Sequence, residues 1–123
     1  MKLLTHNFLQ SIVKNITKPY PLIISSDKYE IIEVEYSEIA VKRMIERVEY
    51  SALLSALNDL KYSHSLPENL PEENSMDEEF LKKMHHCLFE IEVMEGNLIC
   101  PESERKYPVM RGIPNMLLTE NEV

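Results

Sequence analysis

The sequence predicts an α+β fold in which β-rich segments at both ends of the chain flank a helical middle. Three observations support this. Apolar residues partly alternate over residues 22–36, as in strands; they recur with a helical period over residues 37–94; and a strand–turn–strand pattern follows. Because the two ends read as halves of one ribbon, we expect a discontinuous β domain over residues 1–36 and 95–123. Residues 37–94 are then a helical insertion.

The first third of the chain predicts a short helix followed by a β-hairpin. Apolar residues near the start have near-helical spacing over residues 3–10. β-branched and aromatic residues then fill residues 22–24 and 29–36, and the polar residues 25–28 between them are typical of a turn. We therefore expect two strands that pair with each other across that turn.

Helical periodicity begins near Ser37. A second apolar run over residues 53–60 has the same period, and the spacing leaves open whether the two runs form one bent helix or two. In the first run, one apolar helix face is predicted by the i, i+3, i+4, i+7 spacing of Val41, Met44, Ile45 and Val48.

Residues 63–74 contain prolines and several carboxylates, which indicates a loop. Ser75 and Glu78 then match a capping box, in which Ser75 caps the helix that follows. A turn over residues 95–97 is expected to end this helix, and a strand over residues 97–100 starts the closing hairpin. The apolar stripe of the helix consists of Phe80, Met84, Cys87, Leu88 and Ile91.

Charge and composition exclude several classes of protein. The net charge is −8, from 13 Lys and Arg against 21 Asp and Glu, whereas binding to phosphate backbones depends on an excess of cations. No apolar run approaches the ~20 residues of a membrane helix, and the polar start lacks a signal-peptide core. Two cysteines do not make a disulfide framework. We therefore expect a protein of the cytoplasm and nucleus.

No group of residues in the sequence suggests catalysis or a bound cofactor. The most tempting metal cluster is His85-His86-Cys87, but neighbouring side chains on a helix point about 100° apart and cannot converge on one ion. Cys87 in the core, with one histidine at its edge, is the better reading. The isolated Gly96 and Gly112 do not form a nucleotide-binding loop. We predict no catalytic, cofactor-binding or metal-binding residues.

Four segments together resemble one protein family over almost the whole chain: residues 1–9, 47–52, 79–86 and 100–118. The family is the small multifunctional activating subunit of S-adenosylmethionine-dependent methyltransferases that act on tRNA, ribosomal RNA and a translation release factor. The resemblance implies a zinc-ribbon-like β domain built from both termini with a helical insertion. It also implies a non-catalytic subunit that forms heterodimers with methyltransferase catalytic subunits. S-adenosylmethionine is then expected on the partner and not on this chain.

The resemblance also implies four zinc-binding positions, which fall here on Ser11, Ile16, Cys100 and Ser103. A structural zinc site needs four Cys or His ligands. Because cysteine is kept only at Cys100, we predict a degenerate ribbon that holds no zinc. Ile16 and Leu98 are expected to pack where the metal would stand.

The C-terminal segment is the predicted partner-binding surface. Ile113, Met116, Leu117 and Leu118 are more apolar than a small ribbon without metal can cover, although an internal core remains the alternative. The strand around residues 106–111 is expected near a sheet edge, where it could add to a sheet of the partner. The predicted partner-binding residues are Leu4, Thr5, Asn7, Phe8, Val109, Met110, Arg111, Ile113, Pro114, Asn115, Met116 and Leu117.

The sequence disfavours two other classes of function: a degenerate zinc ribbon that binds nucleic acid directly, and an enzyme in its own right. The negative net charge and the scattered basic residues disfavour nucleic-acid binding. The absence of a nucleophile paired with a base in the sequence disfavours catalysis. The preferred hypothesis is a methyltransferase activator that contacts neither nucleic acid nor membrane directly.

Overall fold

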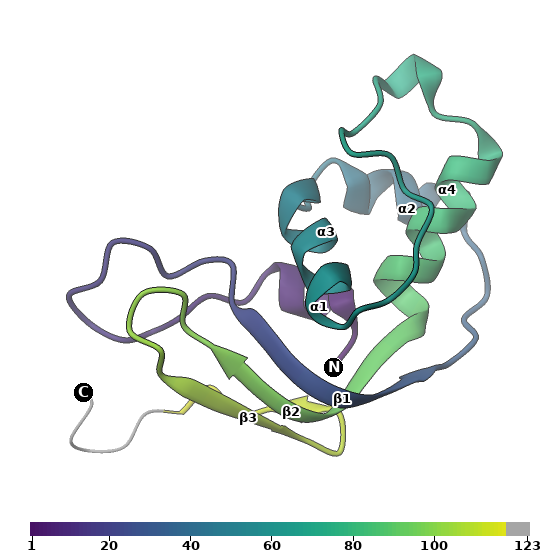
Figure 1. The fold of residues 1–123 in the computed structure, drawn as a ribbon. Coiled ribbons are helices and arrows are strands. Elements are labelled where there is room, and N and C mark those ends of the chain that lie inside the picture. The colour runs from purple at the N-terminus through teal and green to yellow at the C-terminus, as the bar shows by residue number, and fades with distance from the viewer. Residues whose placement is uncertain (118–123) are drawn as a thin grey trace.

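The computed structural model describes residues 1–117, which fold into a four-stranded antiparallel sheet with helices on one side of it (Figure 1). The expected α+β class is therefore confirmed. The strand order is β1-β2-β3-β4, with β1 at one edge and β4 at the other. The bounds of the strands are β1 Ile23–Ile31, β2 Ile91–Ile99, β3 Lys106–Met110 and β4 Ile113–Pro114.

The hairpin predicted over residues 22–36 is wrong, because residues 25–28 lie inside a single strand. β1 pairs with β2, which comes much later in the chain, and Ile23 stands opposite Ile99. The polar residues are accommodated as an irregularity in the pairing, where the Ser26 hydroxyl donates to the carbonyl of Glu95. Short polar residues suit a bulge in a strand as well as a turn between strands. Local composition therefore did not distinguish the two.

A register shift on either side of the pair Lys28–Glu95 also changes which side chains of β2 face the helices. Ile91 and Val93 are buried before the shift, and Leu98 is buried after it. A one-residue insertion exchanges the two faces of a strand, so residues of both parities reach the core. A simple alternation of apolar and polar residues is consequently absent from β2.

Gly96 lies within β2, and the turn and helix end predicted at residues 95–97 are wrong. The Gly96 φ is +150°, and a Cβ there would come within 2.4 Å of the Ser25 carbonyl oxygen. Glycine is therefore required by the close approach of β1 and not by a turn. β2 begins at Ile91, four residues before the expected start of the β domain at residue 95.

The helical middle contains separate helices, which settles the choice left open by the sequence. α2 (Glu38–Ile45) begins after Ser37, whose hydroxyl accepts a hydrogen bond from the Ala40 amide, as an N-cap does. α3 (Tyr50–Asp59) follows, and the first helix, α1 (Leu3–Asn7), lies near the start of the chain. No helix within residues 1–117 is both long and apolar enough to cross a bilayer.

The last helix starts two residues later than the predicted capping box. Ser75 ends a short 3₁₀ turn, η1 (Glu73–Ser75), and Asp77 caps α4 (Glu78–His85) by accepting a hydrogen bond of 2.8 Å from the Phe80 amide. A π-helical turn, η2 (His86–Glu90), continues α4 directly into β2. The core between helices and sheet is made of large, fully buried side chains, among them Leu3, Leu22, Leu53, Leu57, Leu81, Met84, Leu88 and Leu98.

Candidate partner-binding surface

The β3–β4 hairpin and the residues after it form a shallow, mostly apolar groove of about 570 Å³. Large apolar side chains are exposed to solvent here: Met110 is 67% exposed, Ile113 69% and Leu117 79%. Apolar exposure concentrated in one place on a small protein marks an interaction site. The groove is lined by Pro108, Met110, Ile113, Pro114, Asn115, Met116 and Leu117.

A two-residue turn gives the hairpin its shape. Arg111 and Gly112 both have positive φ, of 52° and 78°, which is the conformation of a type I′ turn. The flanking residues Met110 and Ile113 are paired across the hairpin. Directly paired residues project to the same face of a sheet, so these two exposed side chains form one patch.

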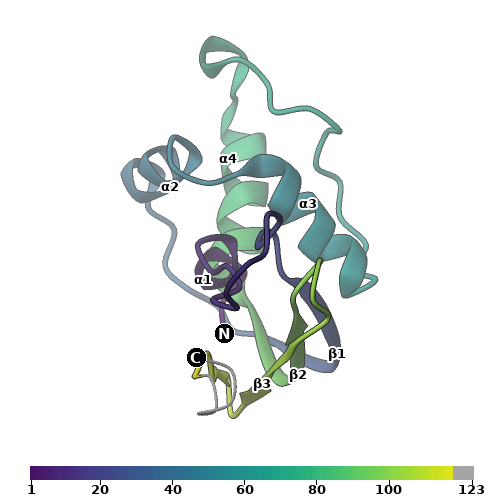
Figure 2. The same cartoon turned by 90° about the vertical axis from the view of Figure 1, so that its left-hand side faces the viewer.

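The start of the chain is attached to this hairpin through β2. The Met1 amino group donates to the Val93 carbonyl at 2.9 Å and to the Gly112 carbonyl, while the Val93 amide donates to the Met1 carbonyl at 2.7 Å. The Gly112 amide donates to the Met94 carbonyl at 2.9 Å. As a result, α1 and the yellow C-terminal segment lie on the same side of the molecule in Figure 2.

α1 contributes part of the predicted surface. Phe8 is 53% exposed and Thr5 is exposed, while Leu4 is half-buried against the core. Met116 is also half-buried against the core, so the alternative of an internal role holds for this residue in part. Leu118 lies outside the described residues.

Two residues predicted to contact a partner lie inside the protein instead. Val109 is a core residue of β3. Asn7 is buried, and its side-chain amide donates to the Glu49 carbonyl and accepts from the Glu49 amide, both at 2.9 Å. This pair of bonds fixes α1 to the start of α3. Because both residues are buried, neither is available to a partner. The sequence pattern showed their polarity and spacing but not which side of the chain packs against the core.

The expectation of an open edge at residues 106–111 also needs correction. β4 covers the outer half of β3, with Val109 opposite Pro114, and the Asn115 amide donates to the Pro108 carbonyl at 2.8 Å. The sheet edge therefore runs along β4 beside Val109 and Met110, and along β3 only at its start. A strand from a partner could pair with residues 113–117 or with the first residues of β3.

The degenerate knuckle is held by hydrogen bonds. The Ser11 hydroxyl lies 3.0 Å from the Tyr107 hydroxyl, which also accepts a bond of 3.1 Å from the Ile12 amide. The Ser103 amide donates to the Cys100 sulfur at 3.4 Å. Burial favours a raised pKa for the Cys100 thiol, but hydrogen bonds from Ser103 and Ser11 outweigh it and the net pKa is lowered.

These residues do not fit zinc. Serine hydroxyls replace two of the four thiolates that the family resemblance implies, and Ile16 offers no ligand atom. Across residues 1–117, no cluster of three or more His, Cys, Asp or Glu side chains is arranged to hold a metal ion. Leu98 is fully buried as expected, whereas Ile16 is only half-buried. Sequence reasoning missed Tyr107. This residue of β3 is fully buried, and its hydroxyl bonds to the Ser11 hydroxyl in the segment after α1.

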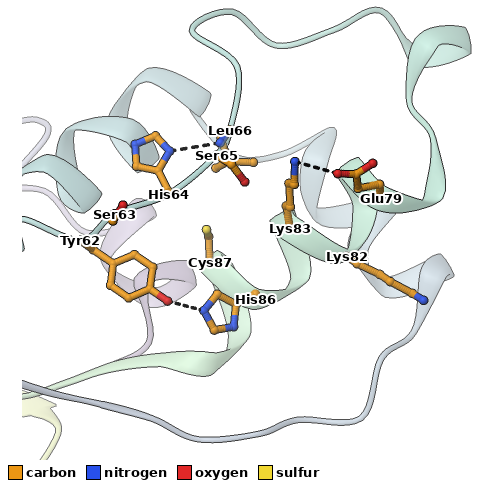
Figure 3. Close-up of a pocket in the computed structure, with 10 residues that line it drawn as sticks. All are labelled: Tyr62, Ser63, His64, Ser65, Leu66, Glu79, Lys82, Lys83, His86 and Cys87. Carbon is orange, nitrogen blue, oxygen red and sulfur yellow. Dashed lines mark hydrogen bonds and ion pairs between the residues drawn. The ribbon is translucent and has the colours of Figure 1, made fainter.

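A second cleft of about 470 Å³ separates residues 62–66 from α4 and η2 (Figure 3). The Tyr62 hydroxyl lies 2.6 Å from His86 Nε2, and His86 Nδ1 lies 2.8 Å from a Glu90 carboxylate oxygen. His85 instead bonds to the Val34 carbonyl at 2.8 Å. Both histidines approach the Glu90 carboxylate, His85 Nε2 at 3.7 Å and His86 Nδ1 at 2.8 Å, while Cys87 is buried, as the sequence predicted.

This second cleft is poorly suited to nucleophilic chemistry. Burial raises the pKa of Cys87 to about 12, and burial is also the main cause of the raised pKa of Tyr62. Both groups are protonated at neutral pH, when a nucleophile would need to be ionised. The hydrogen bonds of Tyr62 and His86 instead fasten the segment after α3 to η2.

Comparison with known proteins gives a consistent family match. Residues 2–112 match the family model described as Trm112p-like protein. The chain is 46% identical to the mouse multifunctional methyltransferase subunit TRM112-like protein, covering 99% of this chain and 98% of that protein. It is 42% identical to the Arabidopsis thaliana multifunctional methyltransferase subunit TRM112 homolog A, covering 100% of both.

A solved structure of a related complex has the same fold. It is described as the E. cuniculi Mtq2–Trm112 complex responsible for the methylation of the eRF1 translation termination factor. The matched chain has a TM-score of 0.57 and 22% sequence identity, and the match covers 95% of each chain.

Proposed function

The chain belongs to the Trm112p-like family, and from that premise we propose that it is a non-catalytic subunit that binds, stabilises and activates methyltransferase catalytic subunits. The relatives are named as methyltransferase subunits, and the structural neighbour is part of a complex with Mtq2. The resemblance found in the sequence is confirmed at the level of the family. Targets of the assembled enzymes would include tRNA, ribosomal RNA and a translation release factor, in the cytoplasm and nucleus.

The observation that carries the proposal is the apolar groove at the β3–β4 hairpin. Met110, Ile113 and Leu117 are largely exposed in a chain with a net charge of −8, where solubility would favour polar residues. Covering such side chains with a partner removes apolar area from water, which is the main driving force of stable association. Thr5 of α1 and Phe8, which follows the helix, would extend the same contact, because Met1 ties α1 to the hairpin through Val93 and Gly112. 

The separation between a binding subunit and a catalytic partner also determines the domain roles and cofactors that we propose. The sheet and both chain ends would form the docking part, and the helical insertion would support it. The methyl donor S-adenosylmethionine would bind to the catalytic partner. Zinc would be absent from this chain, since the residues at the implied positions do not fit it.

Coexpression with a catalytic subunit from the same organism tests the proposal. We expect a soluble heterodimer with methyltransferase activity, whereas the catalytic subunit alone is less soluble and less active. Ile113→Asp should weaken the complex about 30-fold, or about 2 kcal/mol, if Ile113 is a central anchor. Ile39→Asp is a matched control, because Ile39 on α2 is 66% exposed but lies outside the groove.

Both variants are checked for folding by circular dichroism. Equal effects of Ile113→Asp and Ile39→Asp would remove the hairpin from the interface. A salt-dependent gel shift of RNA by the isolated chain would instead favour the nucleic-acid-binding alternative.

A further inference from the structure

The proposed function leaves open what kind of surface covers the groove. Resting on that function, we propose that the catalytic partner meets the β3–β4 hairpin with an apolar patch flanked by carboxylates, one group for Lys106 and one for Arg111. The proposal concerns the chemistry of the partner and rests on the arrangement of charge around the groove.

On the outer face of β3, the cation Lys106 lies in line with the groove residues Pro108 and Met110. Side chains of a strand alternate between faces, so Lys106, Pro108 and Met110 share a face, and Tyr107 and Val109 are buried on the other. Pro108 and Met110 line the groove. Lys106 is exposed and stands at the start of this row.

Arg111 stands at the opposite end, in the turn that follows Met110. It is exposed, and the positive φ of Arg111 belongs to the type I′ turn, so its backbone position is set by the hairpin. Lys106 and Met110 are four residue steps apart in β3, which is about 13 Å at ~3.3 Å per residue. The groove is thus bordered by positive charge at two places roughly that far apart.

Both of these cations are exposed. Within residues 1–117, neither Lys106 nor Arg111 forms an ion pair. Some other lysines are paired: Lys28 lies 3.8 Å from Glu95, and Lys83 lies 3.2 Å from Glu79. In a chain with 21 acidic residues, two cations that border the apolar groove and form no ion pair with residues 1–117 favour a partner of complementary charge.

The rim position determines which property the charges affect. Charges at the rim of an interface mainly accelerate association and make it dependent on salt, whereas apolar anchors at the centre mainly slow dissociation. Lys106 and Arg111 should therefore act on the association rate constant. Ile113 should act on the dissociation rate constant.

The test is to measure association kinetics of the chain with its catalytic subunit at about 50 mM and about 500 mM salt. The variant Lys106→Glu/Arg111→Glu should associate about tenfold more slowly at low salt, and the difference should shrink at high salt. The control Arg43→Glu/Arg47→Glu changes the net charge by the same amount at exposed residues of α2 and the turn after it. It should keep the association rate much closer to that of the wild type.

Each outcome decides something. Equal slowing by both double variants would show an effect of total charge and overturn the inference. An unchanged association rate and salt dependence of Lys106→Glu/Arg111→Glu would also overturn it, while leaving the proposed function intact. Failure of the wild-type chain to bind any methyltransferase subunit would instead contradict the proposed function itself.

Discussion

The hydroxyl of Tyr107 lies 3.0 Å from the hydroxyl of Ser11, which occupies one of the four positions where the family resemblance implies a zinc ligand. The two residues belong to opposite ends of the chain. Their bond joins the loop after α1 to β3 in the place where a metal would otherwise join the two knuckles. Hydrogen bonding and burial of an aromatic ring thus hold this end of the sheet together.

Removal of the Tyr107 hydroxyl should destabilise the protein. In Tyr107→Phe, the buried Ser11 hydroxyl and the Ile12 amide lose a partner, at an expected cost of about 1–3 kcal/mol in the free energy of unfolding. Urea unfolding of the wild type and the variant measures this difference. In Ser11→Ala/Tyr107→Phe, the loss should be smaller than the sum of the single losses, and strict additivity would contradict the bond.

The purified protein should contain no stoichiometric zinc. Because serine and isoleucine stand at three of the four implied positions, a chelator should leave the melting temperature unchanged. Elemental analysis of the protein before and after treatment with chelator checks both statements. Close to one zinc ion per chain would refute this prediction.

The cap of α4 should depend on Asp77 and not on Ser75. Asp77→Ala removes the acceptor of the Phe80 amide and should lower the free energy of unfolding by about 1 kcal/mol. Ser75→Ala should change it little, because Ser75 ends the preceding 3₁₀ turn. The comparison requires only equilibrium unfolding of the two variants. The reverse order of effects would restore the capping box suggested by the sequence.

The turn of the β3–β4 hairpin should respond oppositely to two substitutions. Arg111→Asn places a residue that tolerates positive φ where arginine now adopts 52°, so the melting temperature should rise. Gly112→Ala should lower it, because φ is +78° there and a Cβ would lie 3.2 Å from the Met1 nitrogen. Thermal unfolding followed by circular dichroism measures both shifts. A Gly112→Ala variant as stable as the wild type would contradict this geometry.

Stability should decrease below about pH 6.5 through His6. Burial is the main cause of the lowered pKa of His6 in the folded protein, from a usual 6.5, although a bond to the Leu22 carbonyl and nearby Asp59 oppose it. The unfolded chain therefore binds the proton more readily, and stability is lost as the pH falls through 6.5 towards the folded pKa. Urea midpoints at pH 7.5 and 5.5 measure the loss.

His6→Gln provides the control for that measurement, since glutamine cannot take up the proton. It should be less stable than the wild type at pH 7.5 but should lose less stability on going to pH 5.5. Burial raises the pKa of Asp59 in the folded protein, which has the opposite effect on stability as the pH falls. An equal loss in both proteins would assign the pH dependence to groups other than His6.

Helices were the elements that the sequence predicted best, because their information is local. Ser37 and the i, i+3, i+4 spacing after it lie within one stretch of chain, so the start of α2 was found correctly. The cap of α4 failed by two residues, since Ser75 and Asp77 both carry a suitable side chain and only backbone geometry distinguishes them.

The sequence by itself determined the α+β class, the family and the apolar character of residues 113–117, because composition and local pattern carry these properties. Tertiary structure alone decided that β1 pairs with β2, that Gly96 makes room for Ser25, and that Val109 faces inward. These facts depend on which distant segments meet. Pairing in an antiparallel sheet joins residues far apart in the chain, and a one-residue shift exchanges its two faces, so no local window of sequence contains the answer.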